Sequence, residues 1–218
     1  MAKVSVIIPA LNEVGSIGQV LNDIPKDRVD EILVADGGSK DGTAELVTKM
    51  GYRIITQEKK GYGAAIMSGI NHAKGDVVVV INADGSMNPK DIPSLVDKIS
   101  EGYDMVLASR YLPGAGSEDD TILHYIGNKI FTFMCNALYG LKISDVLYFF
   151  IAARKEIFEK IRPTSCNAGF CVEVPIRARK AGFKIGELAS FEKKRTAGKA
   201  KVNAFTTGFK ILIRILKL

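Results

Sequence analysis

Short apolar segments alternate with longer amphipathic segments through the first half of this 218-residue chain. The apolar segments are four to six residues long, as is typical of strands, and the amphipathic segments repeat their apolar positions with helical spacing. Strands are predicted at residues 4–8, 31–35, 53–56, 76–81 and 105–108, and helices at residues 16–24, 42–50, 63–73 and 89–100. This alternation predicts an α/β fold in which a mostly parallel sheet is flanked by helices.

The pattern changes in the second half. Residues 121–141 are predicted to form a long helix that is apolar almost all round, except for one stripe of polar side chains at every fourth position: His124, Asn128, Thr132 and Asn136. An extended segment is expected near residues 146–151, helices near residues 154–161 and 172–181, and a strand at residues 184–188. Residues 202–218 are predicted to form a basic amphipathic helix appended to an α/β domain of residues 1–201.

Composition excludes several classes of protein. The chain is 47% apolar and 25% charged, as in ordinary folded domains, so it is neither disordered nor fibrous. Its apolar runs are far shorter than the roughly 18 residues that span a membrane, and no signal peptide is recognised, so a soluble or peripheral protein is expected. Its three cysteines, Cys135, Cys166 and Cys171, fit neither a disulfide framework nor a zinc site. They are expected to be small core residues in a reducing compartment.

Charge is concentrated at the C-terminal end. Eight basic residues and no acidic residue follow Glu192, whereas the other 22 of the 30 basic residues share the remainder with all 24 acidic residues. A basic end of this kind is typical of proteins that bind nucleic acid, phosphates or an anionic membrane. Nucleic acid is disfavoured because the rest of the chain is nearly neutral and has no helix-turn-helix, RRM or zinc-finger pattern.

Polar residues gather in three loops that directly follow predicted strands, at residues 9–15, 36–42 and 82–88. The carboxyl ends of parallel strands meet at one edge of a sheet, where such folds bind ligands. Acids and amides there can bind a base or ribose, and a carboxylate such as Asp84 can hold a divalent cation against a diphosphate. Local explanations remain open, since Ser39 or Asp41 can cap a helix and Asp-Gly pairs are common in turns. A dinucleotide-binding oxidoreductase is disfavoured, because Gly61 and Gly63 lack a third glycine and follow the third strand.

Five segments in register, SVIIPALNE, ILVADGGSKDGT, GYGAAIMSGI, VVVINADGSMNP and SRY, resemble the family 2 glycosyltransferases of the GT-A fold. More narrowly, they resemble the dolichol-phosphate mannosyltransferase-like branch. The later segments GNKIFTFMCNALYGLKISD and VEVPIRARKAGFKIGELASFEKKRTAGKAK extend the resemblance over nearly the whole chain. It implies a GT-A (Rossmann-like) fold and a metal-dependent, inverting transfer of a sugar from a nucleotide diphosphate sugar to a polyprenyl (dolichyl-type) phosphate.

The resemblance also implies roles for individual residues. Those beside the nucleotide are Pro9, Leu11, Glu13, Asp36, Asn82 and Ala83. Mg²⁺ or Mn²⁺ is expected on Asp84, Asn82 and Ser86. Catalytic roles fall to Asp84, Arg110, Arg195, Lys201 and Glu173. Glu173 either orients the sugar or acceptor or lies on a solvated helix face.

The chemistry implied by the resemblance agrees with these residue types. Donor and acceptor both carry phosphate, so a cation with Arg and Lys must offset their repulsion. A phosphate acceptor is already an oxyanion near pH 7, so no strong general base is required. This fits the two histidines, His72 and His124, which both fall within predicted helices and offer no obvious base.

Three positions depart from the family pattern. Asn82 replaces the first acid of the Asp-x-Asp motif, which removes a charge and is expected to lower metal affinity. Phe149 stands where the family has glycine, and is expected to narrow or reshape the acceptor pocket. Ala200 replaces the serine of the late basic loop. These departures keep open a catalytically weak relative that binds nucleotide or lipid phosphate and acts through a partner.

Two expectations concern the C-terminal region. The loop of residues 192–201 is expected to be mobile without ligand and to order over the phosphates. The helix of residues 202–218 is expected either to lie on an anionic membrane, at its cytoplasmic face, or to fold back onto the domain. The donor base (GDP or UDP) and the sugar are left open.

Overall fold

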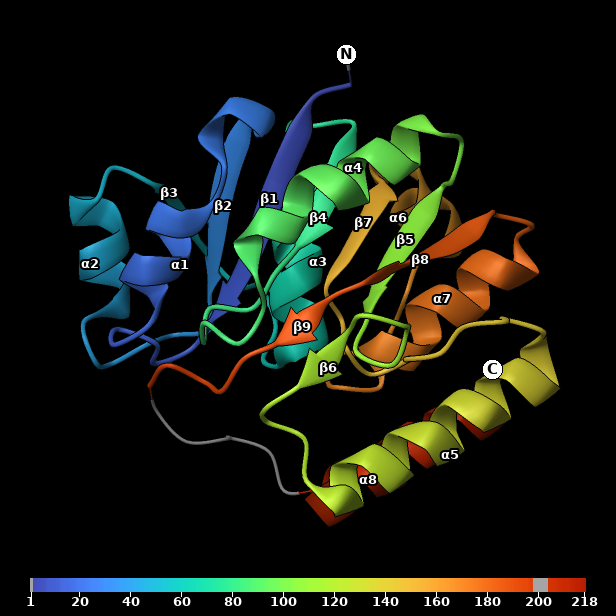
Figure 1. Ribbon diagram of the computed structural model, residues 1–218. Coiled ribbons are helices and arrows are strands. Elements are labelled where there is room, and N and C mark those ends of the chain that lie inside the picture. The colour runs from blue at the N-terminus through green and yellow to red at the C-terminus, as the bar shows by residue number, and fades with distance from the viewer. Residues whose placement is uncertain (1, 198–203) are drawn as a thin grey trace.

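The computed structural model describes residues 2–197 and 204–218, and it is organised around one seven-stranded sheet (Figure 1). The strand order is β3-β2-β1-β4-β7-β5-β8, and only β7 runs antiparallel to its neighbours. The strands are β1 (Val4–Ala10), β2 (Glu31–Asp36), β3 (Arg53–Thr56), β4 (Val77–Val80), β5 (Met105–Ser109), β7 (Ile151–Arg154) and β8 (Ile185–Ala189). The mostly parallel α/β sheet is therefore confirmed.

Helices cover both faces of the sheet and bury two apolar layers. One layer is formed with α1 (Ile17–Asp23), α2 (Thr43–Lys49) and α4 (Ile92–Ser100). The other is formed with α3 (Tyr62–His72), α5 (Ile122–Tyr139), α6 (Lys155–Ile161), α7 (Phe170–Lys180) and α8 (Ala204–Leu216). Short 3-10 turns lie at Lys26–Arg28 and Pro89–Asp91. Each predicted helix is present, with bounds shifted by a few residues.

Two features of the fold differ from the sequence-based expectation. A small parallel sheet joins β6 (Gly116–Ser117) to β9 (Phe191–Glu192), which no pattern predicted. The extended segment expected at residues 146–151 becomes a strand only at β7. The reason is Asp145, whose carboxylate accepts hydrogen bonds from the N–H groups of Leu147 and Tyr148 at 3.2 and 3.1 Å and so holds a local turn before the strand.

Helix α5 buries polar side chains and exposes apolar ones. The middle of its polar stripe faces the protein, with Asn128 and Thr132 buried, whereas His124 is exposed, as are apolar side chains such as Ile122 (81% exposed) and Phe133 (72%). The inward polar groups are satisfied, since Asn128 Nδ2 donates to Asp145 at 2.6 Å and Thr132 Oγ1 donates to Asn128 Oδ1 at 3.1 Å. In Figure 1, α5 lies beside α8 at the edge of the molecule farthest from the sheet.

Helix α8 packs against α5 and α7 and buries Ile211 and Ile215 in the core. It leaves other apolar side chains outside, among them Phe205 and Phe209. One of its basic residues, Arg214, faces the domain and pairs with the buried Glu173. Within the described ranges, the helices are all too short or too polar to cross a bilayer.

The cysteines occupy two environments. Cys135 and Cys171 are buried, as expected, whereas Cys166 is half-buried and lies in the loop between α6 and α7. The core prediction is therefore wrong for Cys166, because this loop approaches the start of α3. The carbonyl oxygen of Cys166 accepts a hydrogen bond from Ala64 N at 3.3 Å, and a Cβ at Gly61 would overlap it.

Candidate active site

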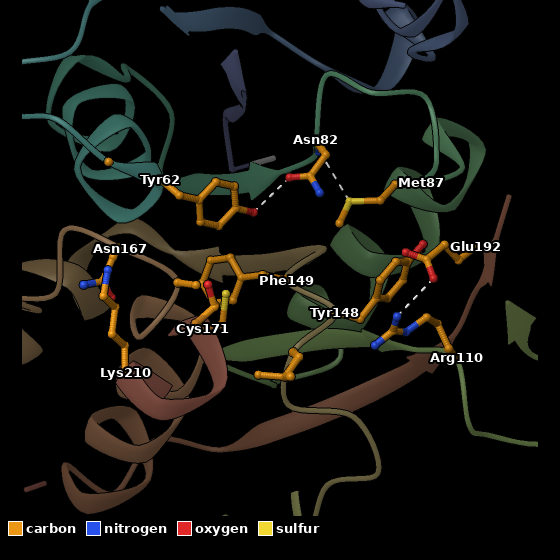
Figure 2. A pocket seen from close by; sticks show the side chains of 14 residues that line it. Tyr62, Asn82, Met87, Arg110, Tyr148, Phe149, Asn167, Cys171, Glu192 and Lys210 are labelled. Carbon is orange, nitrogen blue, oxygen red and sulfur yellow. Dashed lines mark hydrogen bonds and ion pairs between the residues drawn. The ribbon is translucent and has the colours of Figure 1, made fainter. Parts of the chain in front are cut away.

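Three connected cavities run from the carboxyl ends of the central strands to the pair of outer helices. The first, called the Asp84 cavity, has a volume of about 330 Å³ and includes Glu13, Asp84 and Arg195. The second, the central cavity, measures about 400 Å³ and is shown in Figure 2. The third, the helix groove, measures about 600 Å³ and lies between α5 and α8.

Shared residues join these cavities into one path. Gly61, Tyr62 and Asn82 line both the Asp84 cavity and the central cavity. Arg110, Leu147, Glu192 and Thr207 line both the central cavity and the helix groove. The path therefore begins among acids and amides at the strand ends and finishes among the apolar side chains of two helices.

The structure brings most of the predicted nucleotide residues together. The Asp84 cavity is lined by Pro9, Leu11, Glu13, Asn82, Ala83 and Asp84 among others. Asp36 is different, because it does not line this cavity. Its carboxylate accepts hydrogen bonds from Gly38 N at 2.8 Å and from Ser39 N at 3.0 Å, so it shapes the loop after β2.

Asp84 is buried and held by two partners. Its Oδ1 accepts hydrogen bonds from Ser86 N at 3.0 Å and Ser86 Oγ at 2.8 Å, while its Oδ2 lies 3.2 Å from a guanidinium nitrogen of Arg195. The structure does not support Ser86 as a metal ligand, since its hydroxyl donates to Asp84 and it lines none of the three cavities. Ser86 instead fixes the orientation of the Asp84 carboxylate.

The surroundings of Asp84 fit a divalent cation completed by substrate. Arg195 lies between Asp84 and Glu13, 4.0 Å from Glu13 Oε1, so this position already favours positive charge. Among residues 2–197 and 204–218, no three His, Cys, Asp or Glu side chains are grouped as a metal site. A cation at Asp84 would therefore take further oxygen ligands from a bound diphosphate.

Asn82 is oriented by Tyr62 rather than left open to the cavity. Tyr62 OH donates to Asn82 Oδ1 at 2.9 Å, as Figure 2 shows. Burial raises the pKa of Tyr62 well above its ordinary value, so the phenol keeps its proton and remains a donor. The predicted metal bond through the Asn82 oxygen would compete with this hydrogen bond, which leaves the Asn82 Nδ2 group as a donor to ligand.

Arg110, predicted to contact phosphate, lines the central cavity and the helix groove, but three carboxylates hold its guanidinium group. The distances are 2.7 Å to Asp145, 3.0 Å to Glu192 and 3.2 Å to Asp120. Burial alone lowers the pKa of Arg110, but these carboxylates more than offset it, so the group stays charged. The cluster carries one positive and three negative groups when all are ionised, so Arg110 does not offer a free cation to phosphate as it stands.

Aromatic and thiol groups shape the central cavity. Phe149 lines it and stacks edge-on against Phe170, with ring centroids 5.4 Å apart, so the departure from glycine does fill space there. The Arg110 guanidinium lies 4.9 Å from the ring centre of Tyr148. Cys171 also lines the cavity, but burial raises the pKa of its thiol to about 12, which makes it a poor nucleophile near neutral pH.

Glu173 is a buried anchor. Its carboxylate accepts hydrogen bonds from Thr164 N at 2.8 Å and Ser165 N at 2.7 Å, and it pairs with Arg177 and Arg214. The alternative of a solvated helix face is therefore wrong. Direct contact with a sugar or acceptor is not supported either, because Glu173 lines none of the three cavities.

The late basic loop is described only in part. Lys193 N donates to Ser86 O at 2.8 Å and Thr196 N donates to Asp84 O at 3.0 Å, which holds this segment against the Asp84 loop. Lys201, predicted to bind phosphate, lies outside the described residues, as does Ala200. Mobility of residues 192–201 stays a prediction.

Sequence patterns missed several residues that line the central cavity, chiefly Tyr62, Glu192 and Lys210. The GYG turn before α3 was a signal for Tyr62, and the end of all acidic residues at Glu192 marked that position. Lys210 was predicted only as part of a basic helix face. Its position in the cavity depends on how α8 packs.

Comparison with known proteins gives consistent matches. Residues 5–162 match the family described as "Glycosyl transferase family 2". A dolichyl-phosphate hexose transferase of Haloferax volcanii is 33% identical over 216 residues, covering 98% of this chain and 92% of that protein. An uncharacterized glycosyltransferase of Mycobacterium tuberculosis is 31% identical, covering 96% of this chain and 94% of that protein. One similar solved structure is glucosyl-3-phosphoglycerate synthase from M. tuberculosis in complex with Mn²⁺, UDP and glucosyl-3-phosphoglycerate. It superposes with a TM-score of 0.80 at 22% identity, and the match covers 99% of this chain and 79% of that chain.

Proposed function

The chain belongs to glycosyl transferase family 2, and from this premise we propose that it transfers a hexose from a nucleotide diphosphate sugar to the phosphate of a polyprenyl (dolichyl-type) lipid. The observation that carries the proposal is that the Asp84 cavity, the central cavity and the helix groove adjoin one another through shared lining residues. The polar donor fits the Asp84 cavity, the transferred sugar fits the central cavity, and the apolar chain of the acceptor fits the helix groove.

The donor end of the path supports a nucleotide diphosphate sugar. Loops after β1 and β4 supply backbone and side-chain groups to the Asp84 cavity, and Glu13 and Asp84 supply negative charge beside it. Mg²⁺ or Mn²⁺ would be held by Asp84 and the donor diphosphate, where it would stabilise the departing nucleoside diphosphate. Ser86 keeps the Asp84 carboxylate oriented, and Arg195 supplies positive charge beside the diphosphate.

The central cavity supports the transfer step. Asn82 Nδ2, oriented by Tyr62, can donate to a sugar hydroxyl or a diphosphate oxygen. The acceptor oxygen attacks the anomeric carbon as the bond to the nucleoside diphosphate breaks, which inverts the configuration. No group of the chain needs to remove a proton, because a phosphate monoester enters already ionised.

The acceptor end supports a polyprenyl chain. The helix groove is lined by apolar side chains from both outer helices, including Leu123, Phe131, Phe209 and Leu212. A related protein of similar length is a dolichyl-phosphate hexose transferase, whose name specifies this class of acceptor. The acceptor phosphate would then lie toward Arg110, where the groove meets the central cavity.

The same two helices support attachment to a membrane surface. Their outward side chains Ile122, Phe133, Phe205 and Phe209 are all more than 60% exposed, and the C-terminal region carries eight basic residues and no acid. An apolar helix face beside basic residues favours an anionic bilayer surface. We propose this surface, at the cytoplasmic face of the membrane, as the working location of the enzyme.

A product assay tests the proposal. The protein is incubated with Mn²⁺, vesicles containing dolichyl phosphate and a panel of UDP- and GDP-hexoses, and the lipids are analysed by mass spectrometry. One donor is expected to give a lipid-linked hexose that disappears with EDTA or with vesicles lacking the acceptor. Absence of any such product would overturn the proposal.

A weak nucleotide-binding relative is the second candidate. Two observations favour it: the Asn82 oxygen is engaged by Tyr62, and the Arg110 guanidinium is held by three carboxylates. Under this alternative the protein binds a nucleoside diphosphate with Mn²⁺ but forms no lipid-linked sugar. Calorimetric titration with UDP and GDP beside the product assay separates the two.

A further inference from the structure

Carboxylates in and beside the central cavity would repel an anionic acceptor, and Arg110 alone cannot offset that repulsion. A phosphate monoester brings up to two negative charges into a space that already includes Glu192, with Asp120 and Asp145 directly behind Arg110. The Arg110 Nε and both terminal nitrogens already contact carboxylates. An anionic acceptor therefore needs a second cation in this cavity.

Lys210 is that cation. It lines the central cavity from α8, and within the described part of the chain no ion pair joins it to a carboxylate. Figure 2 shows Lys210 extending toward Asn167, across the cavity from Arg110 and Glu192. It does not line the Asp84 cavity, so the donor diphosphate at Asp84 is not its natural partner.

The packing of α8 fixes this direction. Lys210 and Arg214 are four residues apart and share one face of the helix. Arg214 on that face pairs with the buried Glu173, and Tyr139 OH donates to the carbonyl oxygen of Ile215 at 2.5 Å. Because these contacts and the burial of Ile215 fix the rotation of the helix, the Lys210 side is held toward the cavity.

The helix groove adjoins the central cavity, which Lys210 lines. Thr207 lines both the groove and the central cavity, and it lies one helical turn before Lys210 on the same helix. A lipid whose chain lies in the groove would carry its phosphate past Thr207. The geometry thus puts an available ammonium group where the polar end of such a lipid enters.

We propose that Lys210 binds the phosphate monoester of the acceptor, with Asn167 and Thr207 beside it; this assignment rests on the proposed function. Helix α8 then contributes to two parts of the acceptor site. Its apolar side chains line the groove for the lipid chain, and Lys210 binds the phosphate headgroup. Lys210 supplies the free positive charge at the phosphate, because the Arg110 guanidinium on the other side of the cavity is already held by carboxylates, and the free phosphate oxygen is directed toward the sugar.

Binding and kinetics of two lysine variants test the assignment. Lys210→Gln removes the charge at the cavity, and Lys217→Gln removes a charge from the same helix at a position that lines none of the three cavities. The probe is citronellyl phosphate, a short soluble isoprenoid phosphate, with citronellol and inorganic phosphate as separate arms. Each is titrated calorimetrically in the presence of Mn²⁺ and the nucleoside diphosphate that the protein binds.

Lys210→Gln is expected to weaken citronellyl phosphate binding at least tenfold and to raise its KM similarly. Citronellol and nucleoside diphosphate binding should stay unchanged, Lys217→Gln should match the wild type, and Lys210→Arg should retain most of the affinity.

Three results would overturn the assignment: unchanged citronellyl phosphate affinity in Lys210→Gln, a loss of nucleotide affinity instead, or no binding of citronellyl phosphate to the wild type. If Lys210-dependent binding is found without lipid-linked product, the site stands and the proposed transfer reaction fails. If product forms with an unchanged KM, the reaction stands and the site fails.

Discussion

Helices α4 and α5 follow opposite rules of burial within one domain. Helix α4 buries Ile92, Leu95 and Ile99 and turns polar residues outward, whereas α5 buries Asn128 and Thr132 and exposes Ile122 and Phe133. Polar groups can be buried only when they find partners, and those of α5 find Asp145 and one another. The surface of α4 is therefore suited to water, whereas the surface of α5 is suited to contact with an apolar neighbour.

This contrast divides the site as well. The Asp84 cavity lies at the strand ends of the sheet, while the helix groove lies between α8 and α5, the helix that buries polar side chains. Asp145 joins the two, because it accepts from Asn128 of α5 and from Arg110 after β5. Changes in one region are therefore expected to leave the other region's function intact, except at Asp145 and at Arg195, which lines both the Asp84 cavity and the helix groove.

The largest expected effect is on chemistry in the sheet layer. Asp84→Ala should lower turnover by about 1,000-fold or more, because the leaving group loses its metal-held stabilisation. Vesicle binding, measured by co-sedimentation, should not change. Full activity of Asp84→Ala, or of wild-type protein after chelator treatment, would disprove the metal assignment.

The junction should carry the largest effect on stability. Asp145 is fully buried, and Asp145→Ala removes one of the three carboxylates that hold Arg110 and the acceptor of Asn128 Nδ2 and of the Leu147 and Tyr148 N–H groups, so the free energy of unfolding should fall by about 3–5 kcal/mol. The control is Asp97→Ala on α4, which breaks a surface pair with Arg28 and should cost at most about 1 kcal/mol. Urea titration of both variants measures the difference, and equal losses would refute the argument.

The two helices should respond oppositely to the loss of an apolar side chain. Leu95→Ala on α4 is expected to lower the free energy of unfolding by about 2–5 kcal/mol, because it opens a cavity in the core. Phe133→Ala on α5 should change it by only about 0.5 kcal/mol, since Phe133 is 72% exposed, but should weaken vesicle binding. Binding should also rise with anionic lipid and fall with salt. Negligible binding of the intact chain to every vesicle would contradict the membrane proposal.

A smaller effect is expected at the boundary of the first two cavities. Asn82→Asp restores a carboxylate beside Asp84 and should tighten Mn²⁺ binding about tenfold in the presence of nucleoside diphosphate, as measured by calorimetry. Tyr62→Phe should also strengthen metal binding if the Asn82 oxygen is released to the metal. Weaker Mn²⁺ binding in Asn82→Asp would show that residue 82 does not face the cation.

The pH dependence of stability should identify the anchor of α8. Burial by itself raises the pKa of Glu173, but hydrogen bonds from Ser165, Thr164 and Arg214 outweigh it, so the pKa lies below its ordinary value. A carboxylate with a lowered pKa stabilises the fold above its unfolded-state pKa, and this contribution is lost as the pH falls through the lower, folded-state pKa. Glu173→Gln should therefore show a smaller loss of stability on acidification than the wild type. Identical pH profiles in thermal unfolding would contradict this anchor role.

Much of the fold and part of the site were predictable from the sequence, because both depend on local pattern. The apolar strands, the helical spacing and the loops after β1 and β4 predicted the sheet and the residues around Asp84. The β6–β9 pairing was not predictable, since two residues on each strand give no periodic signal. The role of Glu173 depends on Arg214, which is distant in sequence, and the role of Ser86 depends on side-chain geometry that sequence spacing does not specify.

The sequence by itself determined that α5 and α8 carry both apolar and polar residues in helical register, and that the C-terminal region is basic. Only the tertiary structure decided which side of each helix faces inward. Helical periodicity fixes the angle between residues on one helix but not the rotation of that helix against its neighbours. That rotation is set by specific contacts, such as Asn128 with Asp145 and Arg214 with Glu173. These contacts leave apolar side chains of α5 and part of those of α8 facing outward, and they bring Lys210 to the central cavity.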